Sequence, residues 1–147
     1  MSIQNRKTVR GALATAITTA VSGTGKPLQA VYGYYPKEFG GQSPVCTIES
    51  LPIQINLKTG VNLQNYDFAV TFWALTDGAT GSGMTASDAE DKLDDLHYAL
   101  CLMLKEPPSS SAIGNAEFLQ PSDQIKMAME SGNVYQAETH YVRLSRP

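Results

Sequence analysis

Residues with catalytic or metal-binding potential are few in this sequence and mostly far apart. They are two histidines, His97 and His140, and two cysteines, Cys46 and Cys101. His97 follows Asp94 by three residues and precedes Cys101 by four, so a helix would place these three side chains on one face. A zinc site needs three or four such ligands. We favour a simpler interpretation, in which Cys101 packs inward and His97 caps the edge of the core.

The other candidates for chemistry also have simple structural explanations. Five of the fourteen acidic residues lie between Asp88 and Asp95, where the pattern predicts the solvated face of a helix. Residues 23–26 (GTGK) partly match a phosphate-binding loop, but Ala20 and Pro27 stand where that motif needs a glycine and a hydroxyl residue. His140 falls within a strand-like segment. We therefore predict no catalytic residue, no cofactor and no metal site, and a protein that is not an enzyme.

Composition limits the classes of protein further. The length of 147 residues favours one domain over residues 1–147. Charged residues make up only 17% of the chain, a sparse surface that indicates partial coverage by other subunits. The net charge of −3, without a basic patch, argues against tight binding of duplex DNA. No apolar run is long enough to cross a membrane, and Met1–Arg10 lacks the apolar stretch of a signal peptide.

The two cysteines support the same picture. Cys46 lies in a strand-like segment and Cys101 in a helix-like segment, both rich in apolar residues. We predict that both are buried free thiols in a reducing compartment, rather than a disulfide or metal ligands.

Hydrophobic periodicity predicts the elements that must position these residues. Residues 6–21 repeat an apolar residue every four positions and precede two glycines and a proline, which predicts a helix. Residues 28–32 and 44–49 have extended patterns, and residues 53–58 alternate apolar and polar side chains. The clearest strand covers residues 66–75. One of its faces is apolar and the other is mixed, which suits helices on one side of a sheet and a partner on the other.

The second half predicts another helix. It opens at Ser87, with Glu90 completing a capping box, and it ends before Pro107. Its buried stripe is Ala89, Leu93, Leu96, Leu100 and Leu104. Residues 105–116 are expected to form a loop.

The tail of the chain predicts a hairpin. Residues 122–130 alternate as a strand and pair, through a turn at Gly132-Asn133, with a strand over 134–144. A short helix over 122–130 is the competing interpretation. The order of elements predicts an α+β fold, in which two α-helices pack on one face of a mostly antiparallel or mixed β-sheet.

Aromatic residues give the clearest indication of function. Four of them surround a loop over residues 33–43 that is rich in glycine: Tyr32, Tyr34, Tyr35 and Phe39. Exposed aromatic rings on a loop are typical of protein contacts. The alternative is that these rings cover one end of the core. Stacking on nucleobases is a third interpretation, but only Lys37 supplies positive charge nearby.

The order and spacing of segments carry a resemblance that covers nearly the whole chain. The segments are an Ala-rich helix (Val9–Val21), VYGYYP (Val31–Pro36), SPVCTI (Ser43–Ile48), an aromatic strand (Tyr66–Ala74), an acidic helix (Ala89–Leu96) and a Tyr-containing strand (Tyr135–Leu144). In this order the chain resembles the tail terminator, or tail completion, proteins of long-tailed bacteriophages and related minor tail and neck proteins. Residues 51–65 depart from the compact pattern, as an extra hairpin reaching a neighbour or as a long loop.

The resemblance implies that the protein is a structural component of the virion and is assembled in the host cytoplasm. Members of this group form a ring, commonly a hexamer, on the head-proximal end of the tail tube. The ring stops tube polymerisation and presents a surface to a head–tail connector or adaptor protein, while DNA passes through the lumen without specific binding. The expected partners are thus further copies of this chain, the tail tube protein and the connector. The candidate contact residues are Tyr34, Tyr35, Lys37, Phe39, Tyr66 and Trp73.

Two other classes fit the same composition. A head-closure or connector adaptor protein of the neck would differ only in the partner it binds. A small enzyme or ligand-binding domain would need a pocket that uses His97, Cys101 or His140. The loops over 33–43, 58–64 and 77–85 would carry the contacts of a ring protein.

Overall fold

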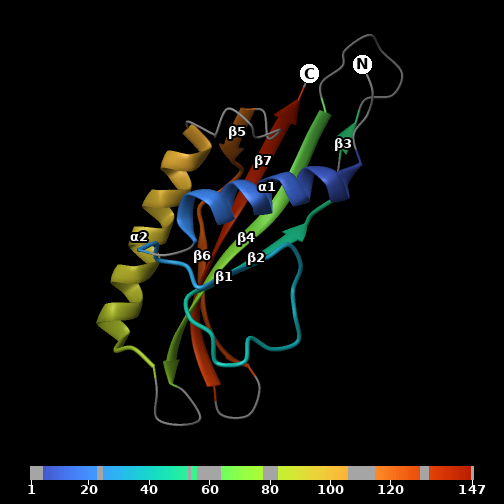
Figure 1. Ribbon diagram of the computed structural model, residues 1–147. Helices are drawn as coiled ribbons and strands as arrows, with labels where there is room; N and C mark the ends of the chain where they lie inside the picture. The colour runs from blue at the N-terminus through green and yellow to red at the C-terminus, as the bar shows by residue number, and fades with distance from the viewer. Residues whose placement is uncertain are drawn as a thin grey trace.

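The computed structural model describes residues 5–22, 25–52, 54–55, 64–77, 83–105, 115–129 and 133–146. Two helices, α1 (Arg6–Val21) and α2 (Ala86–Lys105), cover one face of a sheet (Figure 1). The strands are β1 (Ala30–Tyr32), β2 (Val45–Ser50), β3 (Gln54–Ile55), β4 (Gln64–Asp77), β5 (Asn115–Phe118), β6 (Asp123–Met129) and β7 (Asn133–Arg146). The α+β class predicted from the sequence is confirmed.

The sheet is mixed. β1 pairs with β2 in parallel, and the other strand pairs among the described residues are antiparallel. β4 pairs with β2 and β3 along one edge and with β7 along the other, while β5 and β6 pair with the far edge of β7. β6 and β7 form the predicted hairpin, so residues 123–129 are a strand and not the competing helix.

Side chains at the N-terminal ends of the helices explain where the helices begin. The Asn5 carboxamide accepts a hydrogen bond from the Lys7 amide at 2.8 Å, which caps α1. α2 begins at Ala86 because the Thr85 hydroxyl accepts from the Asp88 amide at 3.1 Å. The predicted capping box that opens at Ser87 is therefore wrong by two positions, since Thr85 is the residue whose side chain reaches a free amide of the first turn.

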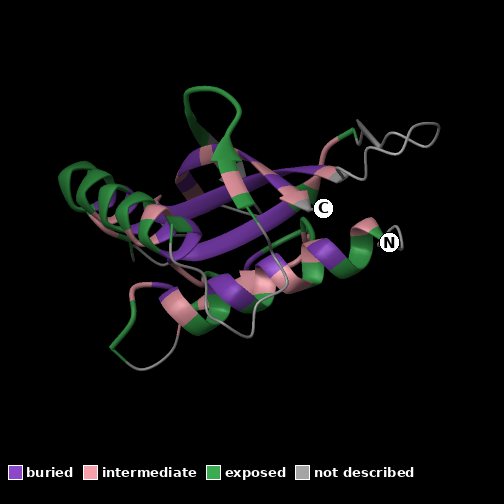
Figure 2. Cartoon of the chain, turned by 90° about the horizontal axis from the view of Figure 1, so that it is seen from above, coloured by how far each residue is buried: buried purple, intermediate pink, exposed green. Residues whose placement is uncertain are grey.

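The main core lies between the helices and the face of the sheet that they cover, which we call the inner face. Alternate residues of β4 point there and are buried: Tyr66, Phe68, Val70, Phe72 and Ala74. They pack against apolar stripes of both helices, including Leu13 and Ile17 of α1 and Leu93 and Leu96 of α2. In Figure 2 the buried residues appear as purple stretches of the central strands and purple patches on the helices. The buried stripe predicted for α2 is confirmed in full.

The opposite, outer face of β4 is buried as well, by other parts of the same chain. Thr71 shares a 2.8 Å hydrogen bond with Thr139, and Asp67 accepts two hydrogen bonds from the Arg143 guanidinium, at 2.8 and 3.0 Å. Trp73, 2% exposed on this face, donates its indole N–H to the Thr47 hydroxyl at 2.9 Å. The side chains of β4 on this face are therefore buried within the chain itself, and contact of this face with a partner stays a prediction.

Some sequence expectations need correction or fall outside the described residues. Asn115 and Ala116, expected in a loop, belong to β5 and pair with β7. Gln54–Ile55 pairs with Gln64–Asn65, which supports a hairpin in the region of residues 51–65. Residues 58–63 of the loop predicted over 58–64, and residues 78–82 of the loop predicted over 77–85, lie outside the described residues, whereas Gln64 begins β4. No described helix is both long and apolar enough to cross a membrane.

Asp67→Ala is expected to lower the free energy of unfolding by about 2 kcal/mol, because it leaves the Arg143 guanidinium without its carboxylate. Urea unfolding followed by circular dichroism measures the loss. Glu90→Ala, which removes an exposed carboxylate on α2, is the control and should change stability by less than about 0.5 kcal/mol. Equal stability of the two variants would contradict a structural role for the Asp67–Arg143 pair.

Candidate functional site

An aromatic cluster lies at one end of the outer face, where residues 33–43 cross the sheet. Its base is buried: Phe39 and Trp73 are 2% exposed and Tyr135 is 0% exposed. The Phe39 ring lies 5.3 Å from the Trp73 ring and 5.2 Å from the Tyr135 ring, measured between centroids. Such tilted and edge-to-face pairs stabilise the cluster beyond the area they bury.

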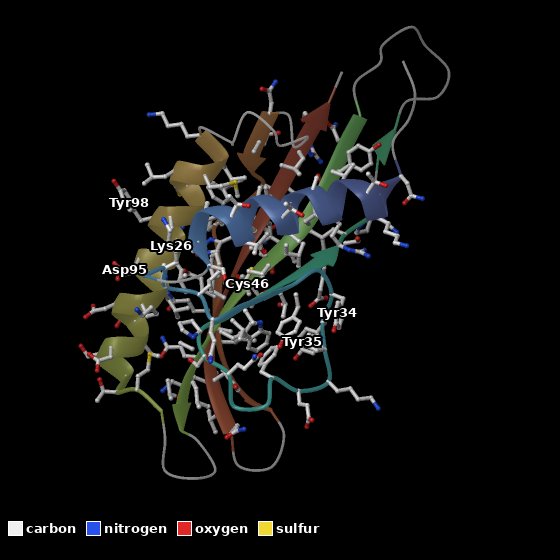
Figure 3. All side chains as sticks on the ribbon, viewed as in Figure 1. Lys26, Tyr34, Tyr35, Cys46, Asp95 and Tyr98 are labelled. Atoms are coloured by element: carbon white, nitrogen blue, oxygen red, sulfur yellow. The ribbon has the colours of Figure 1, made fainter. Side chains whose placement is uncertain are left out.

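Two tyrosines form an exposed layer on this base. Tyr34 is 60% exposed and Tyr35 is 40% exposed, and Figure 3 shows them on the segment that crosses the sheet. The Tyr35 ring stands edge-on to Trp73 at 5.7 Å, and the Tyr34 ring stands edge-on to Tyr32 at 5.8 Å. Lys37 is exposed on the same segment. Three of the six predicted contact residues therefore belong to one exposed segment.

The other three predicted contact residues are core residues. Phe39 and Trp73 are buried in the base of the aromatic cluster, and Tyr66 is 0% exposed on the inner face beneath α1 and α2. For Phe39 the alternative interpretation, a ring that covers one end of the core, is confirmed. The sequence offers no sign of this difference, because Phe39 sits among the same glycines and tyrosines as its exposed neighbours.

Hydrogen bonds hold the crossing segment in place. The Tyr135 hydroxyl donates to the Gln42 carbonyl at 2.9 Å, and the Tyr32 hydroxyl donates to the Gln42 side-chain carbonyl. The Ser43 hydroxyl accepts from the Leu75 amide of β4 at 2.8 Å. The segment is therefore anchored on β1, β4 and β7 at once.

A tight turn reverses the segment after Phe39. The Gln42 amide donates to the Phe39 carbonyl at 3.0 Å, and Gly40 and Gly41 between them have φ values of 59° and 78°. Both values lie in the left-handed region that glycine adopts without strain. The turn buries the Phe39 ring and leaves Tyr34 and Tyr35 on the surface.

The surroundings of Tyr35 keep its hydroxyl group neutral. Partial burial, and then the nearby Glu49 carboxylate, raise the pKa of Tyr35 above its ordinary value. The hydroxyl therefore stays protonated at neutral pH.

A second cluster lies on the inner face, where α2 crosses β7. His140 of β7 is 2% exposed and its ring stacks on that of His97 of α2, with centroids 4.9 Å apart. The Cys101 thiol lies 3.5 Å from His97 Nε2, and the Phe118 ring lies 6.0 Å from that of His140. Sequence reasoning placed His97 beside Cys101 but missed the stacking on His140, because no local pattern links residues 43 positions apart.

A carboxylate completes this cluster. Glu138 Oε1 lies 3.2 Å from His140 Nε2, but that nitrogen has no hydrogen bond of good geometry among the described residues. Glu138 Oε2 instead accepts hydrogen bonds from the Ser122 hydroxyl at 3.0 Å and from the Gln124 side-chain amide at 3.1 Å. Burial lowers the pKa of His140, the Glu138 carboxylate opposes this, and His97 adds to it.

The chemistry of these groups favours packing over catalysis. Burial raises the pKa of the Cys101 thiol, which keeps it protonated and a poor nucleophile. Asp94, the third member of the predicted trio, is exposed, and among the described residues no group of three or more His, Cys, Asp or Glu side chains could hold a metal ion. Cys46 is a buried free thiol, as predicted. Cys101 is also a free thiol but is only partly buried, because it lies between the buried and the exposed faces of α2.

Phe39→Ala is expected to lower the free energy of unfolding by about 3 kcal/mol, because it removes the ring at the centre of the buried aromatic base. Tyr34→Ala, which truncates an exposed ring of the same segment, should cost less than about 0.5 kcal/mol. Urea titration of both variants measures the difference. Two small and similar losses would show that Phe39 is not part of the core.

The His140 environment predicts a pH dependence of stability. In the unfolded chain this histidine titrates near its ordinary pKa of 6.5, and in the folded chain its pKa is lower. Between the two values the unfolded chain binds more protons, so the free energy of unfolding should fall as the pH drops below about 6.5. Thermal unfolding between about pH 8 and pH 5 checks this.

The matched variants for that experiment are His140→Gln and His97→Gln. The first should flatten the pH dependence, whatever its effect on stability at pH 7, because it removes the titrating group. The second should keep most of it, because burial of His140 remains. Parallel curves for the wild type and His140→Gln would assign the pH dependence to other groups.

No protein-family model matches the chain, and no curated protein matches its sequence. The function proposed next therefore depends on the contacts described above and on the order of the sequence segments.

Proposed function

We propose that this chain is a structural protein of a long-tailed bacteriophage virion. It forms a ring on the head-proximal end of the tail tube, ends polymerisation of the tube and joins the tail to the head connector. The observation that carries the proposal is the pair of exposed tyrosines, Tyr34 and Tyr35, held on a buried aromatic base. The sequence resemblance to tail terminator proteins supplies the identity of the partner.

The aromatic layer suits a protein contact for a physical reason. Binding costs entropy whenever loops and side chains must be ordered at an interface. Here the Tyr35 ring already rests on Trp73, and the backbone of the segment is tied to β4 and β7 through Ser43 and Gln42. Tyrosines in such positions are common among the residues that dominate binding energy.

The sheet offers a further kind of contact. β1 has three residues and pairs with β2 along one edge, so its other edge has no strand partner among the described residues. An open edge can accept a strand from another subunit. Because β1 leads directly into residues 33–43, such a contact would adjoin the aromatic layer.

The charge of the chain is compatible with a ring around DNA. A net charge of −3, without a basic patch, repels phosphates weakly and would let DNA slide past. The inner-face cluster of His97, His140 and Cys101 gives an enzymatic interpretation little support, because its thiol is protonated and His140 is buried.

The test is to mix the purified chain with tail tubes that lack a terminator, and to count capped ends by electron microscopy. The wild-type chain should cap the head-proximal ends. The double variant Tyr34→Ser/Tyr35→Ser should bind tubes at least about tenfold more weakly, because it removes both exposed rings. Its circular dichroism spectrum should be unchanged, since neither ring is buried.

Ile125→Ser is the matched control. Ile125 is 44% exposed, close to the 40% of Tyr35, but lies on β6, at the opposite edge of the sheet from β1. This variant should cap tubes as the wild type does. Capping by the double tyrosine variant at wild-type affinity would contradict the proposed contact. Binding of the wild type to isolated connectors but not to tubes would identify a neck adaptor instead.

A further inference from the structure

α2 carries a second stripe of side chains, on the side opposite its buried stripe. The stripe consists of Asp91, Asp95, Tyr98 and Leu102, spaced by four, three and four residues, so these side chains share one face of the helix. Tyr98 is 65% exposed and Leu102 is 51% exposed. Figure 3 shows Asp95 and Tyr98 pointing away from the sheet. We call this face the α2 stripe; at 1.5 Å per residue it is about 16 Å long.

The pairing of apolar and acidic residues on this stripe is informative. Single exposed apolar side chains are ordinary, but Tyr98 and Leu102 are neighbours on adjacent turns and the most exposed large apolar side chains of α2. Asp91 and Asp95 continue the stripe and make no ion pair with a described residue. A surface that binds the α2 stripe therefore needs positive charge opposite the two aspartates, and a surface without large side chains opposite Tyr98 and Leu102.

The first turns of α1 have those properties. Arg6, Lys7 and Arg10 are basic, and no acidic residue lies in the first turn. The helix dipole makes this N-terminal end positive already, so the arrangement is locally unfavourable. Arg6 and Arg10 donate to neutral groups, the Leu51 carbonyl and the Ser50 hydroxyl, and the described residues provide no carboxylate for any of the three.

The outward surface next to these basic residues is smooth. Lys7, Gly11 and Thr15 follow one another at four-residue spacing and are exposed. A Cβ atom added at Gly11 would meet nothing within 4 Å. Small side chains let another helix approach closely, since the distance between packed helices depends on the side chains at the contact.

The two surfaces lie at opposite flanks of the molecule. In Figure 1 α2 forms one side, and the first turns of α1 lie at the other side near the N-terminus. The view from above in Figure 2 shows the same separation. The stripe of a chain therefore cannot meet the first turns of its own α1, whereas a neighbouring copy can offer them.

We infer that the α2 stripe of one copy docks on the first turns of α1 of the next copy. This inference deepens the proposed function, on which it rests, by assigning the contact between neighbouring subunits of the ring. Two different surfaces meet, so the contact is heterologous and each copy uses one surface on either side. A chain of such contacts closes into a ring when the rotation per subunit allows it.

The first measurement is the solution mass of the full chain by light scattering over a concentration series. The wild type should self-associate, and raising NaCl from about 0.05 M to about 1 M should weaken the association because salt screens the charges. Asp91→Lys/Asp95→Lys and Lys7→Glu/Arg10→Glu should each weaken association at least about tenfold, since each places like charges opposite one another. Circular dichroism shows whether each variant is folded.

Mixing the two variants tests the pairing itself. Each lysine stripe then meets a glutamate-bearing α1, and each native stripe meets a native α1, so a one-to-one mixture should assemble like the wild type. Alternating copies close a ring only if its number of subunits is even, as in a hexamer. Glu38→Lys/Glu90→Lys, with the same change in net charge at exposed positions off the stripe, should assemble normally.

Three outcomes would overturn the inference. They are a wild-type chain that stays monomeric at all concentrations, a lysine-stripe variant that assembles normally, and two folded, deficient variants whose mixture does not recover. The tube-capping experiment separates this inference from the proposed function. If the chain assembles in a charge-dependent way but does not cap tubes, the subunit contact is supported and the terminator function is contradicted. If the chain caps tubes but never self-associates, the terminator function is supported and the subunit contact is contradicted.

Discussion

β4 and β7 run side by side for almost their full lengths, from Gln64 opposite Arg146 to Leu75 opposite Tyr135. Every other element is placed by this antiparallel ladder. β2 and β3 pair with the free edge of β4, β5 and β6 pair with the free edge of β7, and both helices cover its inner face. A slip of one residue in its register would turn the buried rings of Tyr66 and Phe68 to the other face, so the inner-face core fixes the register.

The same ladder also positions the exposed tyrosines of the outer face. At one end the Asp67–Arg143 pair and the Thr71–Thr139 hydrogen bond cross from β4 to β7. At the other end Trp73 and Tyr135 support the segment that carries Tyr34 and Tyr35. The exposed tyrosines are therefore positioned by the most regular part of the sheet, although they lie on a segment without regular secondary structure.

The sequence predicts the elements better than it predicts what covers them. The alternation over residues 66–75 is enough to predict a strand and to say which side chains share a face, because that period follows from local geometry. Whether Trp73 faces solvent or a buried ring depends on where residues 33–43 cross the sheet, which is a long-range contact. β5 escapes notice because its four residues include Asn115 and Glu117, and pairing with β7 rather than propensity makes it a strand.

The proposed contacts with the tail tube and with neighbouring subunits do not compete for the same residues. The aromatic layer lies on the outer face beside β1, whereas the α2 stripe and the first turns of α1 belong to the helices on the inner face. A ring subunit needs this separation, because it must hold two neighbours and a tube at once.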